Sequence, residues 1–414
     1  MPSPAERANP LLGRYLTGAE WLGRHGARPV MVVSRREAAG VPPEFPRGDL
    51  VVVPDPDRIE DILFGLARSG FRLGDFESVQ SLRESTVVNA SVLGAIRGVH
   101  AEPGLDAAVA LRDKHVQKAA IRAAGIRTAD SRVVERFELL RADPPEFPFV
   151  VKPIAGSGTK ATFAVRSQPE LDQAAKAVGE VGDVGPWLVE EFIEGVELHV
   201  DGIVRDRKLH FCAVSRYLQN VIEIKDGGVV GSVALTAPEE AALCARVRDL
   251  AARALTALGL REGVFHLEVF DRGTELVFGE CAGRIGGGMI KDCVQRAYGV
   301  DLLEEWARSV LGLLPNPVPA PAAEVFGWIH LQAPAGRVLS APSAADLEAE
   351  PGCVLAEVGL KEGTDAPDPA AASSVKAGRL MVAGADSAGV AERVLELADR
   401  FRRGVLVEDG GPRP

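Results

Sequence analysis

The chain has 414 residues, and this length predicts two or three domains, because single hydrophobic cores rarely grow beyond about 250–300 residues. Hydrophobic residues make up 46% and charged residues 25%, which is typical of a soluble globular protein. The net charge of −11 argues against a surface that binds nucleic acid, although it leaves room for a local basic pocket for phosphate.

Cysteine usage and the N-terminal segment indicate the compartment. The five cysteines include no CxxC pair, and their odd number in a long chain favours reduced thiols. No stretch reaches the roughly 20 apolar residues of a membrane span. Residues 1–18 contain no apolar run typical of a secretory signal. We therefore expect a cytoplasmic protein that binds neither a membrane nor nucleic acid.

The N-terminal part alternates short buried strands with helices. Strands are predicted at residues 29–33 and 50–53, and helices at 59–67 and 87–96. Strands that alternate with helices favour a parallel, Rossmann-like sheet. The first turn has no GxGxxG motif, so a dinucleotide site is not predicted there.

The central and C-terminal parts combine further strands and helices. A helical run at 107–124 precedes this region, and a Pro/Ala-rich connector follows Leu311. The remainder is predicted to be a small α+β unit. Strands are predicted at 131–134, 149–152, 163–165, 187–191, 198–204, 209–215 and 325–331, and helices at 238–258, 289–297 and 387–401.

The first motif that carries chemistry is a loop of small residues, Gly156, Ser157, Gly158 and Thr159, between two apolar strands. Backbone N–H groups in such a loop can approach phosphate oxygens. The loop is not a P-loop, because GxxxxGK[ST] is missing and a strand follows, and a plain hairpin turn is an equal alternative. Lys152 ends the preceding strand, where its ammonium group suits phosphate; the alternative is a lysine that extends to solvent.

The second motif is the acidic segment WLVEEFIEGVELHVDG at residues 187–202. If a strand leaves its sheet here, free backbone groups can pair with the edge of an adenine ring. The carboxylate of Glu197 can accept hydrogen bonds from ribose hydroxyls. An acidic loop on a solvated face is the alternative.

The third motif is a pair of glutamates, Glu268 and Glu280, on two adjoining strands with apolar neighbours. Such carboxylates are costly to bury without a cation, and magnesium favours oxygen ligands that it shares with nucleotide phosphates. Direct opposition of the two acids requires a turn near Thr274, whereas the turn signal lies one or two residues earlier. We therefore predict a β-bulge or a longer loop. Two surface glutamates on a hairpin are the alternative.

The last candidate is Arg284, which lies between Glu280 and the glycines at 286–288, ahead of a predicted helix. A guanidinium group there suits an anion or a developing oxyanion. The competing role is a structural salt bridge to Glu280 or Glu268. A lone histidine such as His266 is expected to be a packing residue.

The order of these pieces resembles the ATP-grasp superfamily. The resemblance rests on Lys114 after Asp113, Lys152 before the glycine loop, the segment EEFIEG at 190–195, and then Glu268, Glu280 and Arg284. It extends over essentially the whole chain and is greatest to carboxylate–amine ligases, such as L-amino-acid ligases and the peptide ligases of natural-product pathways. It implies an α/β and α+β fold with a Rossmann-like pre-ATP-grasp domain at 1–110. An ATP-grasp domain would follow at 111–315, with a lid at about 130–188, and a C-terminal α+β subdomain at 316–414.

The resemblance also assigns the phosphate and metal end of the site. Lys114 and Lys152 are expected to hold the phosphates of ATP, and the loop at 156–159 to fold over them. Glu268 and Glu280 are expected to bind Mg2+, with Mn2+ as an alternative. Many ATP-grasp enzymes have an asparagine two residues after the second glutamate, but here the residue is Ala282, so that metal ligand is absent.

The remaining site residues follow from the same resemblance. Glu190 and Ile193 are expected to meet adenine through backbone atoms, and Glu197 to hold the ribose. Arg284, with Lys152 as a second catalytic residue, is expected to steady the carboxylate, the acyl phosphate and the tetrahedral intermediate.

The implied reaction is the ATP-dependent ligation of a carboxylate to an amine through an acyl phosphate, with ADP and phosphate as products. Phosphoryl transfer needs charge neutralisation and positioning, which lysines, magnesium and arginine supply. The expected substrates are small amino-acid-like molecules, and similar proteins often form homodimers. Two alternatives stay open, a carboxylase that activates bicarbonate and a catalytically silent nucleotide-binding regulatory protein.

Overall fold

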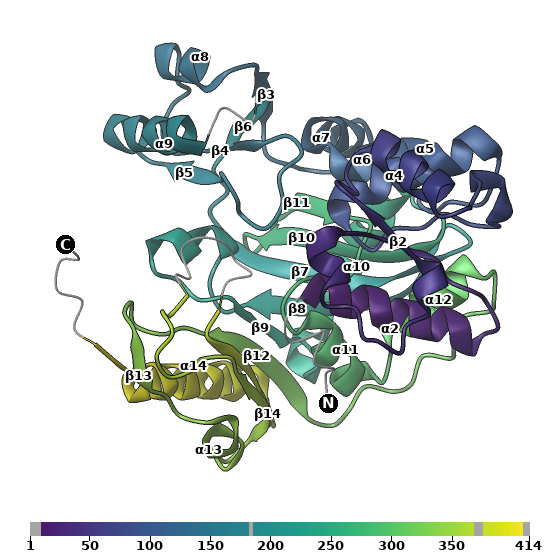
Figure 1. Cartoon of the computed structure of the whole chain (residues 1–414). Helices are drawn as coiled ribbons and strands as arrows, with labels where there is room; N and C mark the ends of the chain where they lie inside the picture. Colours follow the sequence, from purple (N-terminus) through teal and green to yellow (C-terminus); the bar gives the residue numbers. More distant parts are fainter. Residues whose placement is uncertain (1–9, 182–184, 368–375, 409–414) are drawn as a thin grey trace.

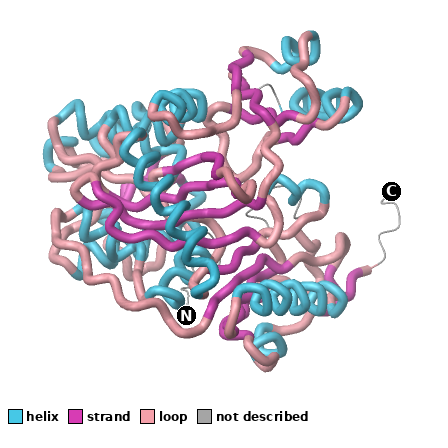
Figure 2. The backbone as a smooth tube through the Cα atoms, turned by 180° about the vertical axis from the view of Figure 1, so that it is seen from behind, coloured by secondary structure: helices cyan, strands magenta, loops and turns pink. Residues whose placement is uncertain are grey.

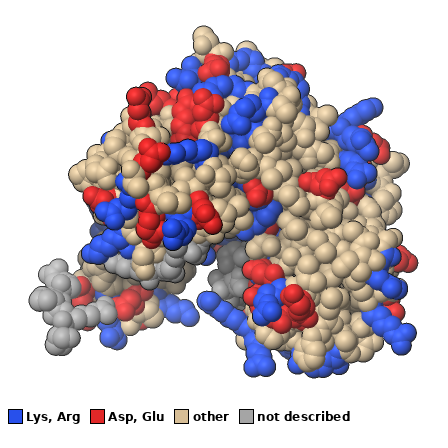
Figure 3. All heavy atoms as spheres, turned by 90° about the horizontal axis from the view of Figure 1, so that it is seen from above, with Lys and Arg blue, Asp and Glu red and all other residues tan. Residues whose placement is uncertain are grey.

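The computed structural model describes residues 10–181, 185–367 and 376–408. Figure 1 shows a large central sheet with a smaller sheet above it and a group of N-terminal helices at its side. None of the described helices combines the length and the apolar composition that crossing a membrane requires. Acidic and basic side chains are interspersed on the face seen in Figure 3.

The N-terminal part contains a small parallel sheet of two strands, β1 (Met31–Ser34) and β2 (Leu50–Val53). The parallel pairing agrees with the Rossmann-like expectation, although the described sheet has only these two strands. The helices are α2 (Pro10–Arg24), α3 (Arg35–Ala38), α4 (Ile59–Arg68) and α5 (Val87–Arg97). Helix α2 precedes the first strand and lies along α12 (Leu302–Val310), far away in the sequence.

The single helix predicted at 107–124 is wrong, because the structure has two helices there, α6 (Leu105–Arg112) and α7 (Lys114–Ala123). Asp113 separates them with an extended backbone, and its carboxylate accepts hydrogen bonds from the N–H groups of His115 and Val116. Capping of this kind satisfies donors at the start of a new helix. The break places Lys114 at the first turn of α7.

The smaller sheet is antiparallel and contains β3 (Ser131–Val134), β4 (Phe149–Pro153), β5 (Phe163–Val165) and β6 (Trp187–Glu191), in the order β3-β6-β4-β5. Helices α8 (Phe137–Ala142) and α9 (Gln168–Val181) pack against it. It has its own core, in which the rings of Phe137 and Trp187 meet edge to face at 5.1 Å. The hydrophobic core of the smaller sheet is therefore separate from those of the central sheet.

The central sheet has eight antiparallel strands: β7 (Val196–Arg205), β8 (Lys208–Tyr217), β9 (Gly231–Ala234), β10 (Gly263–Asp271), β11 (Leu276–Ala282), β12 (Val325–Leu331), β14 (Cys353–Val358) and β15 (Gly378–Gly384). Their order is β11-β10-β7-β8-β9-β12-β15-β14. Alternate residues face opposite sides. On one side Val200, Phe265 and Leu267 pack against helix α10 (Ala241–Ala257).

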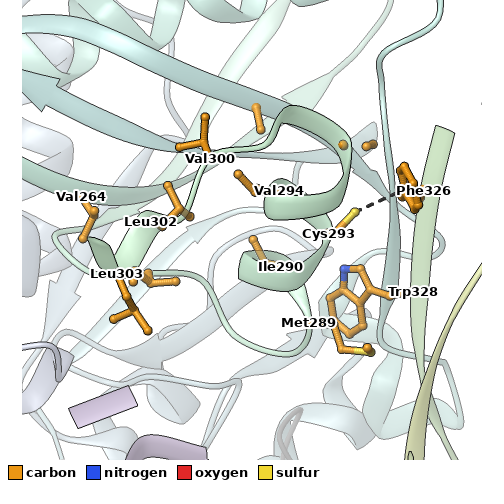
Figure 4. Packing of buried hydrophobic residues seen from close by; sticks show 14 of the residues in the cluster. Val264, Met289, Ile290, Cys293, Val294, Val300, Leu302, Leu303, Phe326 and Trp328 are labelled. Carbon is orange, nitrogen blue, oxygen red and sulfur yellow. Dashed lines mark hydrogen bonds between the residues drawn. The ribbon is translucent and has the colours of Figure 1, made fainter. Parts of the chain in front are cut away.

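The opposite face of the central sheet is covered in part by α11 (Ile290–Tyr298) and α12. Figure 4 shows α11 packed on β12, where the Cys293 thiol donates a hydrogen bond of 3.6 Å to the Phe326 carbonyl. The same face also carries polar residues of the site, among them Asp201 and His266.

The C-terminal part shares the central sheet. Strands β12, β14 and β15 continue it, so the α+β unit predicted after residue 316 has no large sheet of its own. Figure 2 shows this continuity from behind. Helix α14 (Ser387–Gly404) packs on β12 and β15, α13 (Ala344–Glu348) lies against β14, and β13 (Val338–Ser340) pairs with β16 (Leu406–Val407).

Candidate nucleotide and metal site

The two glutamates of the third motif oppose each other across β10 and β11. Glu268 pairs with Glu280, whereas the next pair is Val269 with Phe278, so Gly279 is an extra residue. The predicted β-bulge is therefore confirmed. A side chain at 279 would begin 3.0 Å from the Glu268 carbonyl oxygen, which explains the glycine. The Lys118 ammonium donates a hydrogen bond of 2.9 Å to the carbonyl of this bulged residue.

Five charged side chains beside this bulge form what we call the lysine–glutamate network, Lys114, Lys118, Lys152, Glu190 and Glu280. Lys114 Nζ lies 2.9 Å from Glu280 Oε1, and Lys152 Nζ lies 3.8 Å from Glu280 Oε2. Glu190 forms ion pairs with Lys152 Nζ at 2.5 Å and with Lys118 Nζ at 3.0 Å. The network joins α7, β4, β6 and β11, so it ties the smaller sheet to the central one.

The network changes the acidity of its members. Burial by itself would raise the pKa of Glu280, but Lys114 and Lys152 outweigh it and lower this pKa to about 2. Burial likewise opposes ionisation of Glu190, and Lys118 and Lys152 lower its pKa. Burial lowers the pKa of Lys118. Lys152 behaves differently, because Glu190 and Glu280 overcome burial and raise its pKa. The carboxylates are therefore held ionised.

The glycine loop lies directly beside the network. The Gly156 carbonyl accepts a hydrogen bond from Lys114 Nζ at 2.8 Å and from Arg112 Nη1 at 3.2 Å. Gly158 and Thr159 have φ values of 64° and 59°, and such a conformation is uncommon for threonine. Ser157 and Gly158 are exposed. The structure thus brings the predicted phosphate loop and the two predicted phosphate lysines together.

The residues predicted for adenine and ribose lie on β6, β7 and the link between them. The Glu190 side chain belongs to the network, and its predicted main-chain contact with adenine stays a prediction. Ile193 is buried beside Ala129 and Val277. Glu197 accepts a hydrogen bond from the Val221 N–H at 2.7 Å. Burial and the nearby Glu268 raise the pKa of Glu197 to about 8.

Arg284 pairs with a partner that the sequence did not indicate. Its Nε and Nη2 lie 2.8 and 2.7 Å from Glu84 Oε2, so the competing salt bridge predicted to Glu280 or Glu268 is not the one formed. Glu84 belongs to the N-terminal part and also lies 3.7 Å from Arg112 Nη1. Arg14 on α2 donates to the carbonyls of Ile285 and Gly286 at 3.1 and 2.5 Å. Burial and Arg284 lower the pKa of Arg14 to about 10.

A second group of buried polar side chains lies on the same face, and we call it the histidine chain: Ser232, His199, Asp201 and His266. His199 Nε2 lies 2.8 Å from Ser232 Oγ, and its Nδ1 lies 2.6 Å from Asp201 Oδ2. Asp201 Oδ1 lies 2.9 Å from His266 Nδ1, and His266 Nε2 lies 3.5 Å from Glu268 Oε1.

The electrostatics of the histidine chain show that His266 is more than the packing residue expected from the sequence. Burial would raise the pKa of Asp201 and lower that of His266. The attraction between the two outweighs burial, so the pKa of Asp201 is lowered and that of His266 is raised to about 9. No short motif marks this chain, because its members come from β9, β7 and β10 and share only strand parity.

Comparison with known proteins agrees with this geometry. Residues 119–289, which contain most of both groups, match the family model of the ATP-grasp domain. The chain carries an ATP-grasp domain. It is 26% identical over 316 residues to the L-arginine-specific L-amino acid ligase of Bacillus subtilis, covering 75% of each protein. It is 34% identical over 197 residues to the formate-dependent phosphoribosylglycinamide formyltransferase of Burkholderia pseudomallei, covering 44% of this chain and 46% of the relative.

Solved structures confirm the ATP-grasp fold. The L-amino acid ligase from Bacillus licheniformis superposes with a TM-score of 0.72 at 15% identity, covering 95% of this chain and 96% of the other. The carboxyaminoimidazole ribonucleotide synthase from Aspergillus clavatus, complexed with ATP, has a TM-score of 0.71 at 18% identity and covers 94% and 96%. The family match over residues 119–289 confirms the predicted ATP-grasp resemblance, and the name of the Bacillus subtilis relative agrees with the predicted class of reaction, ligation.

Proposed function

We propose that this chain is an ATP-dependent ligase that activates a carboxylate as an acyl phosphate and joins it to an amine. The observation that carries the proposal is the position of Lys114 and Lys152 around Glu280, beside the glycine loop and opposite Glu268. This arrangement lies in the ATP-grasp domain. The match to an L-amino acid ligase over three quarters of both chains supports amide formation as the second step.

The nucleotide and metal assignments rest on the donor groups present. Glu268 and Glu280 are two opposed carboxylates whose side chains keep 28% and 24% exposure, which suits Mg2+ or Mn2+. A bound metal supplies charge neutralisation to the phosphates. Lys114 and Lys152 are proposed to bind phosphate oxygens, and the main-chain N–H groups of residues 156–159 to close over them.

The nucleoside end follows the same pattern. We assign adenine to the main chain of Glu190 and Ile193, and the ribose hydroxyls to Glu197. Glu197 already accepts one N–H bond, which holds its carboxylate in place for further donors. Its burial favours ligands that bring hydrogen-bond donors of their own.

Arg284 is assigned to the reacting carboxylate. Glu84 fixes its guanidinium group through two donors, so the group is oriented before substrate arrives. In the reaction a carboxylate oxygen attacks the γ-phosphorus and ADP leaves. The amine nitrogen then attacks the acyl carbon, phosphate leaves, and the nitrogen loses a proton. Arg284 stabilises the negative charge on the acyl oxygen during both steps.

The proposed substrates are small amino-acid-like molecules that supply the carboxylate and the amine. A cytoplasmic location is proposed because all five cysteines are free thiols. We propose domain boundaries near residues 110 and 315, a lid over about 130–188, and a homodimer as the assembly to test.

Phosphate release tests the function. The purified chain is incubated with ATP and Mg2+ and a panel of amino-acid pairs, and phosphate and the mass of the product are measured. We expect phosphate only with a carboxylate–amine pair, in equal amount to an amide. Phosphate release that requires bicarbonate instead would identify a carboxylase, and ATP binding without turnover on any pair would identify a regulatory protein.

A further inference from the structure

The histidine chain connects the centre of the sheet to Glu268 without a gap. Pairing places His199 opposite Glu268 and Asp201 opposite His266, so all four side chains lie on one face. The relative exposures of His199, Asp201 and His266 are 1%, 0% and 7%. Buried polar groups of this kind are expensive unless every donor and acceptor has a partner. In the histidine chain, both nitrogens of His199 and both oxygens of Asp201 have partners.

The loop that carries Arg284 rests on the same chain. A Cβ atom at Gly286 would lie 2.6 Å from Asp201 Oδ1 and 2.8 Å from His266 Nδ1, so the backbone packs directly on this pair. Arg14 holds the Gly286 carbonyl from the other side. The Asp201–His266 pair therefore lies between Glu268, the proposed metal ligand, and the loop that carries Arg284, the proposed carboxylate ligand.

One alternative is that the side chains of the histidine chain bind a metal ion themselves. The candidate ligand atoms of His199, Asp201 and His266 all lie within 4.8 Å of one another. However, both oxygens of Asp201 and both nitrogens of His199 already have hydrogen-bond partners inside the chain. An ion at this point would have to replace those bonds. In the histidine chain, His266 Nε2 faces Glu268 Oε1 instead of a shared metal position.

We infer that His266, oriented by Asp201 and His199, is a positioning residue that sets the direction of the Glu268 carboxylate toward a divalent cation. The inference rests on the proposed function only in taking Glu268 as a metal ligand. Asp201 fixes the rotation of the His266 ring through Nδ1, and Nε2 then lies beside one oxygen of Glu268. The opposing residue on β11 is Ala282, which offers His266 no polar partner.

Metal binding tests the inference without relying on turnover. The affinity of the full chain for Mn2+ is measured by electron paramagnetic resonance in the presence of ADP. We expect Asp201→Asn and His266→Gln to weaken Mn2+ binding roughly 10- to 100-fold, as for other residues that support metal ligands. Raising the metal concentration should restore turnover of both variants in the ligase assay. Unchanged Mn2+ affinity in folded variants would overturn the inference.

A matched control separates positioning from general damage to the sheet. Ser215→Ala changes a buried residue on the same face, opposite His199 but outside the chain. It should keep wild-type Mn2+ affinity, and circular dichroism should show all variants folded. If Asp201→Asn does not fold, His266→Gln decides. If neither folds, 15N-histidine spectra of the wild-type chain decide, because Mg2+ with ADP must shift the imidazole signals; unchanged signals overturn the inference.

Two further outcomes are informative. If the purified wild-type protein contains stoichiometric zinc and Asp201→Asn loses it, the histidine chain is a metal site. That result would overturn the positioning role of His266. Glu268→Gln distinguishes the two proposals. If it binds Mn2+ like the wild type, the proposed metal site fails and the inference fails with it. If it loses Mn2+ while Asp201→Asn and His266→Gln keep it, only the inference fails.

Discussion

The two polar groups on the central sheet differ in how they are built. The lysine–glutamate network joins ammonium groups on α7 and β4 to carboxylates on β6 and β11, and Lys152 and Glu280 keep 13% and 24% of their side-chain surface exposed. The histidine chain lies on three strands of one sheet, and His199 and Asp201 are almost fully buried. Ammonium groups are point charges that can exchange one oxygen partner for another, whereas imidazole rings bond in fixed directions. The first group is therefore suited to binding phosphates, and the second to holding other residues in place.

The largest expected effect is at Glu280, which belongs to the lysine–glutamate network and pairs with Glu268, where the histidine chain ends. Glu280→Gln should lower turnover on the order of a thousandfold, because a charged ligand is removed where charge develops in the reaction. Phosphate release measures this loss. The control is Glu275→Gln on the exposed turn before β11, which should turn over normally. Near-normal turnover of Glu280→Gln would remove it from the site.

The next effect separates two lysines that share Glu190. Lys152→Met should weaken ATP binding about tenfold or more, since a charge-assisted contact to phosphate is worth at least about 1.5 kcal/mol. Lys118→Met should instead lower the free energy of unfolding by roughly 3 kcal/mol, because the Gly279 carbonyl and one oxygen of Glu190 lose their buried partner. Nucleotide titration and urea denaturation measure the two effects. The reverse pattern would show that Lys118 is the phosphate ligand.

A smaller effect is expected at Arg14, which supports the loop resting on the histidine chain. Arg14→Gln should lower kcat/KM about tenfold, equal to the roughly 1.4 kcal/mol of one or two hydrogen bonds. Arg24→Gln on the same helix is the control, since its partner Glu20 is exposed and such pairs contribute little. Equal activity of the two variants would show that α2 does not support the site.

The smallest effect concerns Glu197, which lies on β7 two residues before His199 of the histidine chain. Its folded pKa of about 8 lies above the ordinary value of 4.5, so its contribution to stability is present at low pH and is lost as the pH rises toward 8. Glu197→Gln lacks this titration. Without metal or nucleotide, the melting temperature of the variant minus that of the wild type should increase by about 3 °C from pH 5 to pH 8. Parallel melting curves across this range would contradict the raised pKa.

Prediction from sequence succeeded best where the signal is local. The strands at 163–165, 187–191 and 325–331 agree with β5, β6 and β12, because apolar runs between turn residues need no distant information. The helix at 107–124 failed at Asp113, where a capping side chain overrode continuous helical periodicity. In the site, the bulge between Glu268 and Glu280 was predictable because strand parity and turn position conflict within a few residues.

What the sequence by itself determined is the set of chemical groups: two opposed glutamates, two lysines near a glycine loop, and an arginine after the second acid. Only the tertiary structure decided their partners. Glu84 meets Arg284 across 200 residues, Arg14 reaches the loop from a helix outside the ATP-grasp match, and His266 meets Asp201 across β10 and β7. The physical reason is that burial and pairing of charges depend on strand order and register, which bring together side chains whose local sequences carry no common signal.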